Sequence, residues 1–112
     1  HRCSVDFELT QENFVVRNDE GMIDMMRNVA GEVEAVEDVV EYASMAGEDF
    51  AAFASRIPSA FVFIGTANEE VGSDHPHHSP DFNIDEKTLP VGVEMYVRSA
   101  LYYFNTKKGG ER

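Results

Sequence analysis

The sequence contains a single cysteine, Cys3, so no disulfide can form within the chain. This usage is typical of a reducing compartment, and we expect the protein to be cytoplasmic. Basic residues are also scarce, since nine lysines and arginines stand against 21 acidic residues and give a formal net charge of −12. Such a surface repels phosphate groups, which argues against nucleic acids and anionic membranes as partners.

Long apolar runs and a starting methionine are absent as well. No apolar run approaches the roughly 20 residues that a membrane helix needs, so we expect no transmembrane segment. The chain starts at His1, and we expect its N-terminus to be trimmed or internal. With 112 residues, 43% of them hydrophobic, it has enough material for one compact domain with a single core.

Three segments have helical patterns. Apolar residues recur at helical spacing over 21–33, just after the capping pair Asn18-Asp19, and predict an amphipathic helix. A shorter helix is expected to open at Glu48-Asp49-Phe50 and to end at Ile57-Pro58. A third is expected to begin after the N-cap Asp85 and to end near Asn105, with a polar tail over 107–112.

Three further segments have strand patterns. Residues 4–9 alternate polar with apolar, which is typical of a half-buried strand, and 39–42 favour a short one. The continuous apolar run over 60–64 predicts a strand buried on both faces. The resulting order, strand–helix–strand–helix–strand–loop–helix, indicates an α/β fold.

Three of the four histidines lie in Asp74-His75-Pro76-His77-His78-Ser79-Pro80. Neutral imidazole is the commonest protein ligand for zinc and similar metals, and the prolines favour a stiff extended loop. The residues alone leave two interpretations open, a metal site and a solvated surface loop. Adjacent side chains in an extended segment point to opposite faces, which disfavours a separate site built from all three histidines.

Three motifs carry a resemblance to a known family: Gly47-Glu48-Asp49-Phe50, Phe61-Val62-Phe63-Ile64-Gly65-Thr66, and His77-His78-Ser79-Pro80-x-Phe82-x-Ile84-Asp85-Glu86 with Leu89-Pro90-x-Gly92. On these residues the chain resembles, over about 15–105, the C-terminal part of metal-dependent amidohydrolases of the aminoacylase/carboxypeptidase family. This branch includes N-acyl-amino-acid, hippurate and auxin-conjugate hydrolases. The first motif departs from the family's Gly-x-Glu-Asp-Phe segment by one residue in the middle. The family's frequent proline before the Asn-Asp pair is missing here.

The resemblance implies roles for individual residues. His78, directly before Ser-Pro, matches a ligand of one of two divalent metal ions, which would be zinc or manganese. His75 and His77 are not ligands in that pattern. Residues Gly47, Glu48, Asp49, Phe50 and Gly92 would shape the wall of the substrate pocket, with a structural role favoured for Glu48 and Asp49.

The resemblance also implies an organisation into two parts. Residues 1–17 would be a remnant of the lid and dimerisation domain with its return strand. Residues 18–112 would be the C-terminal part of a mixed-sheet metallopeptidase catalytic domain. The family's other metal ligands and its water-activating glutamate have no counterpart in this sequence. A single imidazole does not complete a zinc site, because catalytic zinc takes three protein ligands.

We therefore expect a fragment of an amidohydrolase that hydrolyses the amide bond of small N-acyl amino acids. The isolated chain is expected to be inactive, and the full-length protein to be a homodimer through its lid domain. The alternative is a non-catalytic binding or regulatory module that retains half of the hydrolase fold. An upstream segment that carries the remaining ligands would favour the first interpretation, and a start codon just before His1 the second.

Overall fold

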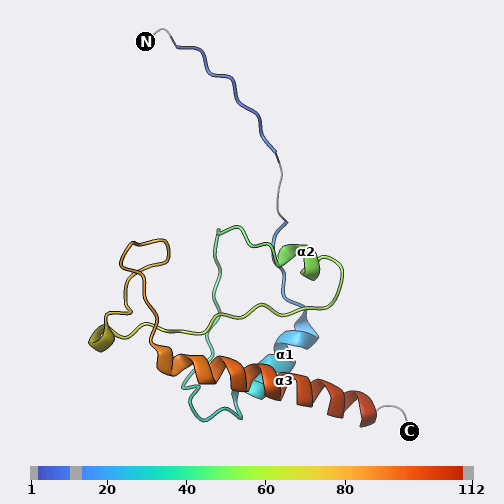
Figure 1. Cartoon of the computed structure of the whole chain (residues 1–112). Coiled ribbons are helices and arrows are strands. Elements are labelled where there is room, and N and C mark those ends of the chain that lie inside the picture. The colour runs from blue at the N-terminus through green and yellow to red at the C-terminus, as the bar shows by residue number, and fades with distance from the viewer. Residues whose placement is uncertain (1–2, 11–13, 110–112) are drawn as a thin grey trace.

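The computed structural model of the chain describes residues 3–10 and 14–109, and its first helix, α1, spans Glu20–Ala30 (Figure 1). The side chain of Asp19 accepts a hydrogen bond of 3.0 Å from the N–H of Met22, which confirms the predicted cap. The helix ends three residues earlier than predicted. Beyond Ala30 the chain continues in turns, in which the N–H of Val33 donates to the carbonyl of Ala30.

The last helix, α3, spans Leu89–Gly109 and follows a single 3-10 turn, η2, at Glu86–Thr88. Asp85 caps this turn as predicted, because its carboxylate accepts a hydrogen bond from the N–H of Lys87. The helix runs past the predicted end at Asn105, since no helix breaker occurs between Asn105 and the Gly109-Gly110 pair. The remainder of the predicted tail, 110–112, lies outside the described residues. Among those residues, no helix combines the length and apolarity needed to cross a bilayer.

The two long helices pack against each other and make the core. Its buried residues are Val29, Ala30 and Val33 from α1 and the turn after it, together with Met95 from α3. Polar contacts border this seam, because the amide of Asn28 donates to the hydroxyl of Tyr102 at 3.4 Å. In Figure 1, α1 crosses behind the middle of α3. The apolar stripe predicted on the first helix is therefore confirmed as core.

The predicted strands do not form in the part of the chain that the structure describes. Residues 4–9 run away from the rest of the molecule, with Phe7 86% exposed (Figure 1). The 60–64 segment is not buried on both faces, because Phe63 is 60% exposed. A strand requires a neighbour to accept and donate its backbone hydrogen bonds, and within residues 3–10 and 14–109 no neighbouring ladder is present. The expectation of a mixed sheet is therefore unmet within these residues.

The molecule is also far more open than a compact domain of the same length. Its radius of gyration is 18.8 Å, against about 13 Å for a compact chain of this length. Its accessible surface is 10217 Å², whereas a folded monomer of this mass exposes about 6,200 Å². One face of α3 contributes to the excess, with a row of exposed apolar side chains at every fourth residue: Leu89, Val93, Val97 and Leu101. The chain has enough apolar residues for one core, but the described residues do not gather them into one.

Candidate functional site

His78 lies at the tip of a tight turn with an unusual backbone conformation. The N–H of Ser79 donates to the carbonyl of Pro76 at 3.2 Å, which closes the turn around His77 and His78. His78 has a φ of 64°, and among the described residues it is the one non-glycine residue with positive φ. This conformation crowds the Cβ atom of an L-residue and costs roughly 1–2 kcal/mol. The side chain is exposed, so the strain is accepted at a residue that contributes nothing to the core.

The neighbouring imidazole has a different environment. The ring of His77 packs edge-on against the ring of Phe82, with 4.7 Å between their centroids and an interplanar angle of 88°. Short-range hydrogen bonds hold Phe82 in place, since its N–H donates to the carbonyl of Ser79 at 3.1 Å. His77 therefore stabilises the tip of the loop. The ring is nevertheless exposed.

The two ends of the histidine loop meet at Asn68 and Asp85. The side-chain amide of Asn68 donates to Asp85 Oδ2 at 2.7 Å, and the N–H of Asp85 donates to the carbonyl of Thr66 at 3.2 Å. Ser73 is almost completely buried beneath them, and its hydroxyl donates to the same Thr66 carbonyl at 2.7 Å. The loop that carries His78 thus starts and ends at one small polar cluster, which lies directly before η2 and α3.

The hydrogen bonds in this cluster favour the charged form of Asp85. The pKa of its carboxyl is lowered, chiefly by the Asn68 side-chain hydrogen bond, next by the N–H of Lys87 and to a lesser extent by the Lys87 charge. Desolvation acts in the opposite direction and does not overcome them. Asp85 is therefore an ionised hydrogen-bond acceptor at neutral pH and anchors the start of the last helix.

The motif at 47–50 forms the start of a short helix, α2, which spans Ala51–Ala54. Glu48 Oε1 accepts a hydrogen bond from the N–H of Phe50 at 3.1 Å, and the Glu48 carbonyl accepts one from Ala51. Glu48 thus satisfies backbone donors at the helix start, which is a structural role. Phe50 stacks on Phe61 with 5.4 Å between ring centroids, while Gly47 and Asp49 are exposed.

Gly92 lies in the first turns of α3, where the helix passes close to the 60–64 segment. A Cβ atom at this position would lie 3.2 Å from Ile64 Cδ1. Such a contact is tighter than ordinary van der Waals packing, so a larger residue here would require the Ile64 side chain to shift by a few tenths of an ångström. The absence of a side chain therefore allows the two to approach each other.

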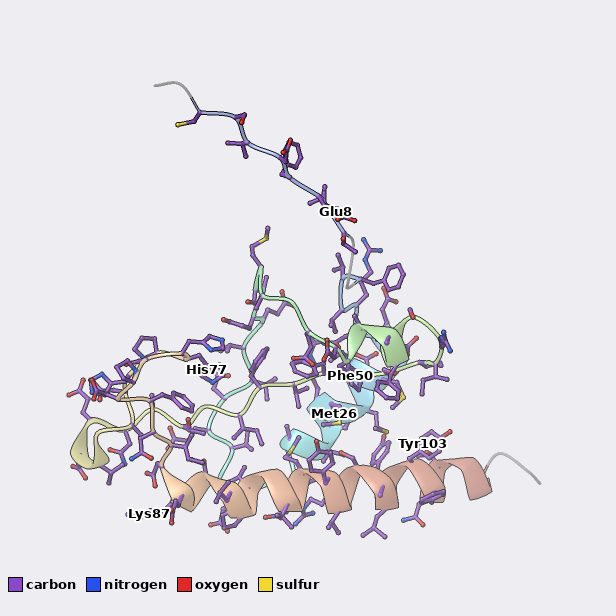
Figure 2. The ribbon with its side chains drawn as sticks, turned by 45° about the horizontal axis from the view of Figure 1, so that its top comes forward. Glu8, Met26, Phe50, His77, Lys87 and Tyr103 are labelled. Atoms are coloured by element: carbon purple, nitrogen blue, oxygen red, sulfur yellow. The ribbon has the colours of Figure 1, made fainter. Side chains whose placement is uncertain are left out.

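The structure brings some of the predicted site residues together and separates others. His78 and Asp85 belong to one loop. The 47–50 motif lies elsewhere, because in Figure 2 Phe50 lies close to α1, whereas His77 lies on the loop at the left of the view. Within residues 3–10 and 14–109, no group of three or more histidine, cysteine or acidic side chains is placed to hold a metal ion. His78 therefore belongs to no such group among these residues.

Sequence reasoning missed two residues of the site, Asn68 and Ser73. Asn68 carried one local signal, because an asparagine before Glu69-Glu70 is a typical cap, and its side chain does accept from the N–H of Glu70. Its hydrogen bond to Asp85 spans 17 residues and has no counterpart in any local pattern. Ser73 gave no signal that distinguished it from a loop serine.

Comparison with known proteins identifies a family. Residues 2–102 match peptidase family M20/M25/M40. IAA-amino acid hydrolase ILR1-like 6 of Arabidopsis thaliana is 52% identical over 63 residues, which cover 56% of this chain and 14% of that protein. No solved structure matches the chain significantly.

Two microbial relatives extend the range of named activities. Thermostable carboxypeptidase 2 of Saccharolobus solfataricus is 31% identical over 104 residues, which cover 92% of this chain and 25% of that protein. N-acetyl-L-cysteine deacetylase of Bacillus subtilis is 38% identical over 73 residues, covering 64% of this chain and 16% of that protein. The chain thus spans about a quarter or less of the length of these relatives.

Proposed function

Since the chain belongs to peptidase family M20/M25/M40, we propose that it supplies His78 as a metal ligand to an amidohydrolase active site. Family membership implies an α/β domain, and peptidases of this family depend in general on divalent metals. The proposed substrates are small N-acyl amino acids. Two divalent ions, zinc or manganese, would occupy the complete site.

The backbone of His78 is the observation that carries this proposal. A positive φ is tolerated at a non-glycine residue where the surrounding structure imposes it, and such residues cluster at ligand-binding and catalytic sites. His78 is exposed at the loop tip, while the adjacent His77 is engaged with Phe82. Both imidazoles are exposed and their rings meet edge-on at 6.1 Å, so the positive φ is what distinguishes His78 from His77.

The imidazole of His78 fits as one ligand of a metal centre. Imidazole nitrogen is a good ligand for zinc, and His78 offers it from a strained turn. Catalytic zinc takes three protein ligands, so the others must come from outside the described residues. When bound, such ions polarise the amide carbonyl and lower the pKa of water. In this proposal the role of the chain is to hold His78 in a fixed position.

The open surface of the chain supports its dependence on a larger catalytic domain. The accessible surface exceeds that of a compact monomer by about 4,000 Å². A standard interface buries only about 800 Å² per partner. An excess of exposed surface of this size is expected when one hydrophobic core is divided between two segments of a protein. The exposed row on α3 and the 60–64 segment would complete that core.

The names of the relatives support the substrate class. They include a hydrolase of IAA-amino acids and a deacetylase of N-acetyl-L-cysteine, and in both names the amino acid carries a further group. In this proposal Gly47, Glu48, Asp49, Phe50 and Gly92 contribute to the pocket wall. Homodimerisation through a lid domain and a cytoplasmic location are part of the same proposal.

The test uses the intact protein that contains this chain and the rest of its catalytic domain. Amino acid release from N-acetyl- and N-benzoyl-amino acids is measured with added zinc or manganese. We expect His78→Ala to remove most activity and bound metal, and His75→Ala, the matched control on the same loop, to change both little. Equal damage by the two substitutions would contradict the assignment of His78.

A second arm uses the 112-residue chain alone. Its hydrolysis of the same substrates should stay at background, because one imidazole does not complete the metal centre. Turnover that a chelator abolishes would show that this chain contains a complete site and would overturn the proposal.

A further inference from the structure

Asp85 takes part in five hydrogen bonds at the end of the histidine loop. Its N–H donates to Thr66, its Oδ2 accepts from Asn68, and its Oδ1 accepts from the N–H of Lys87. Its carbonyl accepts from the N–H and the hydroxyl of Thr88. Asp85 therefore joins the end of the histidine loop to the beginning of α3 and, through Asn68, to the start of the loop.

We propose that the Asn68–Asp85 hydrogen bond positions His78 for metal binding. Asn68 and Asp85 would then be positioning residues of the active site. This inference rests on the proposed function of His78 as a metal ligand. We use the name loop clamp for Asn68 and Asp85. Neither residue would touch the metal or the substrate. Their effect is on where the tip of the loop lies.

The loop clamp matters because the contacts within the loop tip are local. The turn at Pro76–Ser79, the Ser79–Phe82 hydrogen bond and the His77–Phe82 ring contact all join residues within six positions of one another. They shape the tip but do not fix it relative to the helices. The contacts between the two ends of the loop supply that reference, and the 2.7 Å Asn68–Asp85 bond is the charge-assisted one among them.

The expected size of the effect follows from the geometry that metals require. A ligand must be held within about 0.5 Å of its productive position. Residues that orient metal ligands from behind typically change metal affinity or activity by about 10- to 100-fold when substituted. A looser Asn68–Asp85 pair would let His78 sample positions outside that tolerance. A substitution in the loop clamp should therefore lower the free energy of metal binding more than it lowers the free energy of unfolding.

The chemistry of the pair allows a swap that separates positioning from general destabilisation. Asn68→Asp places two carboxylates at the 2.7 Å contact, where they repel each other. Asp85→Asn keeps one acceptor oxygen, which preserves the bond to Asn68 at the expense of the cap on the Lys87 N–H. The double substitution restores an amide donor opposite a carboxylate acceptor, with the roles exchanged. It also keeps both caps, because each new side chain still offers an oxygen to the N–H of Glu70 or Lys87.

The experiment measures Zn²⁺ affinity of the intact protein by chelator competition, together with kcat and the thermal midpoint of each variant. We expect Asn68→Asp to weaken Zn²⁺ binding at least 10-fold and Asp85→Asn to weaken it less than about 3-fold. The double variant should return to within about 3-fold of the parent. Asn28→Ala, which removes a hydrogen bond to Tyr102 far from the loop, serves as the control. It should alter the thermal midpoint and leave Zn²⁺ affinity unchanged.

Two outcomes would overturn the inference. One is an Asn68→Asp variant with parental Zn²⁺ affinity, and the other is a double variant no better than Asn68→Asp alone. His78→Ala, measured in the same series, separates this failure from that of the proposed function. If His78→Ala lowers Zn²⁺ affinity while the clamp variants do not, only the clamp fails. If His78→Ala has no effect, the proposed function fails with it.

Discussion

The side chain of Asn18 pairs with the backbone of Phe61 as a neighbouring strand would. Asn18 Nδ2 donates to the Phe61 carbonyl at 3.0 Å, and Asn18 Oδ1 accepts from the Phe61 N–H at 2.7 Å. Next to this pair, the N–H of Asp19 donates to the carbonyl of Ser59 at 2.8 Å. The start of α1 therefore holds the 60–64 segment, although Asn18 and Phe61 are 43 residues apart.

Substitution of Asn18 should release Phe61. Asn18→Ala removes both hydrogen bonds, each worth about 1 kcal/mol, and amide exchange at Phe61 should become faster. Asn18→Asp keeps an acceptor for the Phe61 N–H but turns a carboxylate oxygen toward the Phe61 carbonyl, so exchange at Phe61 should become faster than in the parent but slower than in Asn18→Ala. The measurement is hydrogen exchange by mass spectrometry or NMR in the intact protein. Equal acceleration in the two variants would contradict the paired geometry.

Substitution of His78 by glycine should separate stability from function. His78→Gly removes the crowding of a positive φ, a cost of about 1–2 kcal/mol, although glycine also makes the unfolded chain more flexible. We expect a net gain of up to about 1 kcal/mol in the free energy of unfolding, together with a loss of bound metal and activity. His77 has no positive φ to relieve and its ring packs against Phe82, so His77→Gly should be destabilising. Denaturant unfolding of both variants checks the opposite signs.

The pKa of Asp85 should respond to Asn68. Because the Asn68 hydrogen bond is the main cause of the lowered pKa, Asn68→Ala should raise it toward the ordinary value of about 3.9. The stabilisation from this carboxylate is complete above its unfolded pKa and is lost as pH falls through the lower folded pKa. Carbon NMR of labelled aspartate measures the shift. Ser73→Ala, which leaves both hydrogen bonds to the carboxylate in place, should not reproduce it.

The isolated chain should associate through its apolar surface. Val97 and Leu101 on α3 are more than half exposed, as are Phe7 and Phe63 on the unpaired segments. The charge of −12 opposes self-association, so added salt should strengthen it by screening the repulsion. Sedimentation at micromolar concentration, at low and high salt, gives the readout. A monodisperse monomer with a cooperative melt would favour the independent-module alternative.

The helices were predictable because their signals are local. The Asp19 cap and the apolar spacing after it fix the start and the buried face of α1, and Asp85 followed by Pro90 fixes the start of the last helix. The ends were less accurate. The first helix stops three residues early in a series of turns, and α3 continues past Asn105 as far as the glycine pair.

The strands and the site depend on partners distant in sequence. The 60–64 run has the composition of a central strand, yet among the described residues the Asn18 side chain pairs with the backbone of Phe61 and no neighbouring strand continues the pairing. The histidine cluster predicted the loop. The positive φ at His78 was not predictable, since few non-glycine residues adopt that conformation and no local pattern requires it here. The Asn68–Asp85 bond joins residues with no shared pattern.

Thermodynamic linkage follows from the position of α3. The helix has 21 residues, which gives a rod of about 31 Å, and it begins a single turn after Asp85. Whatever covers the exposed row from Leu89 to Leu101 also fixes the orientation of that rod, and with it the loop of His78. If His78 binds metal as proposed, seating of the helix and metal binding would favour each other by the same free energy. Bound metal would then strengthen the packing of α3 against the segment that covers it, and better packing would raise the affinity for metal.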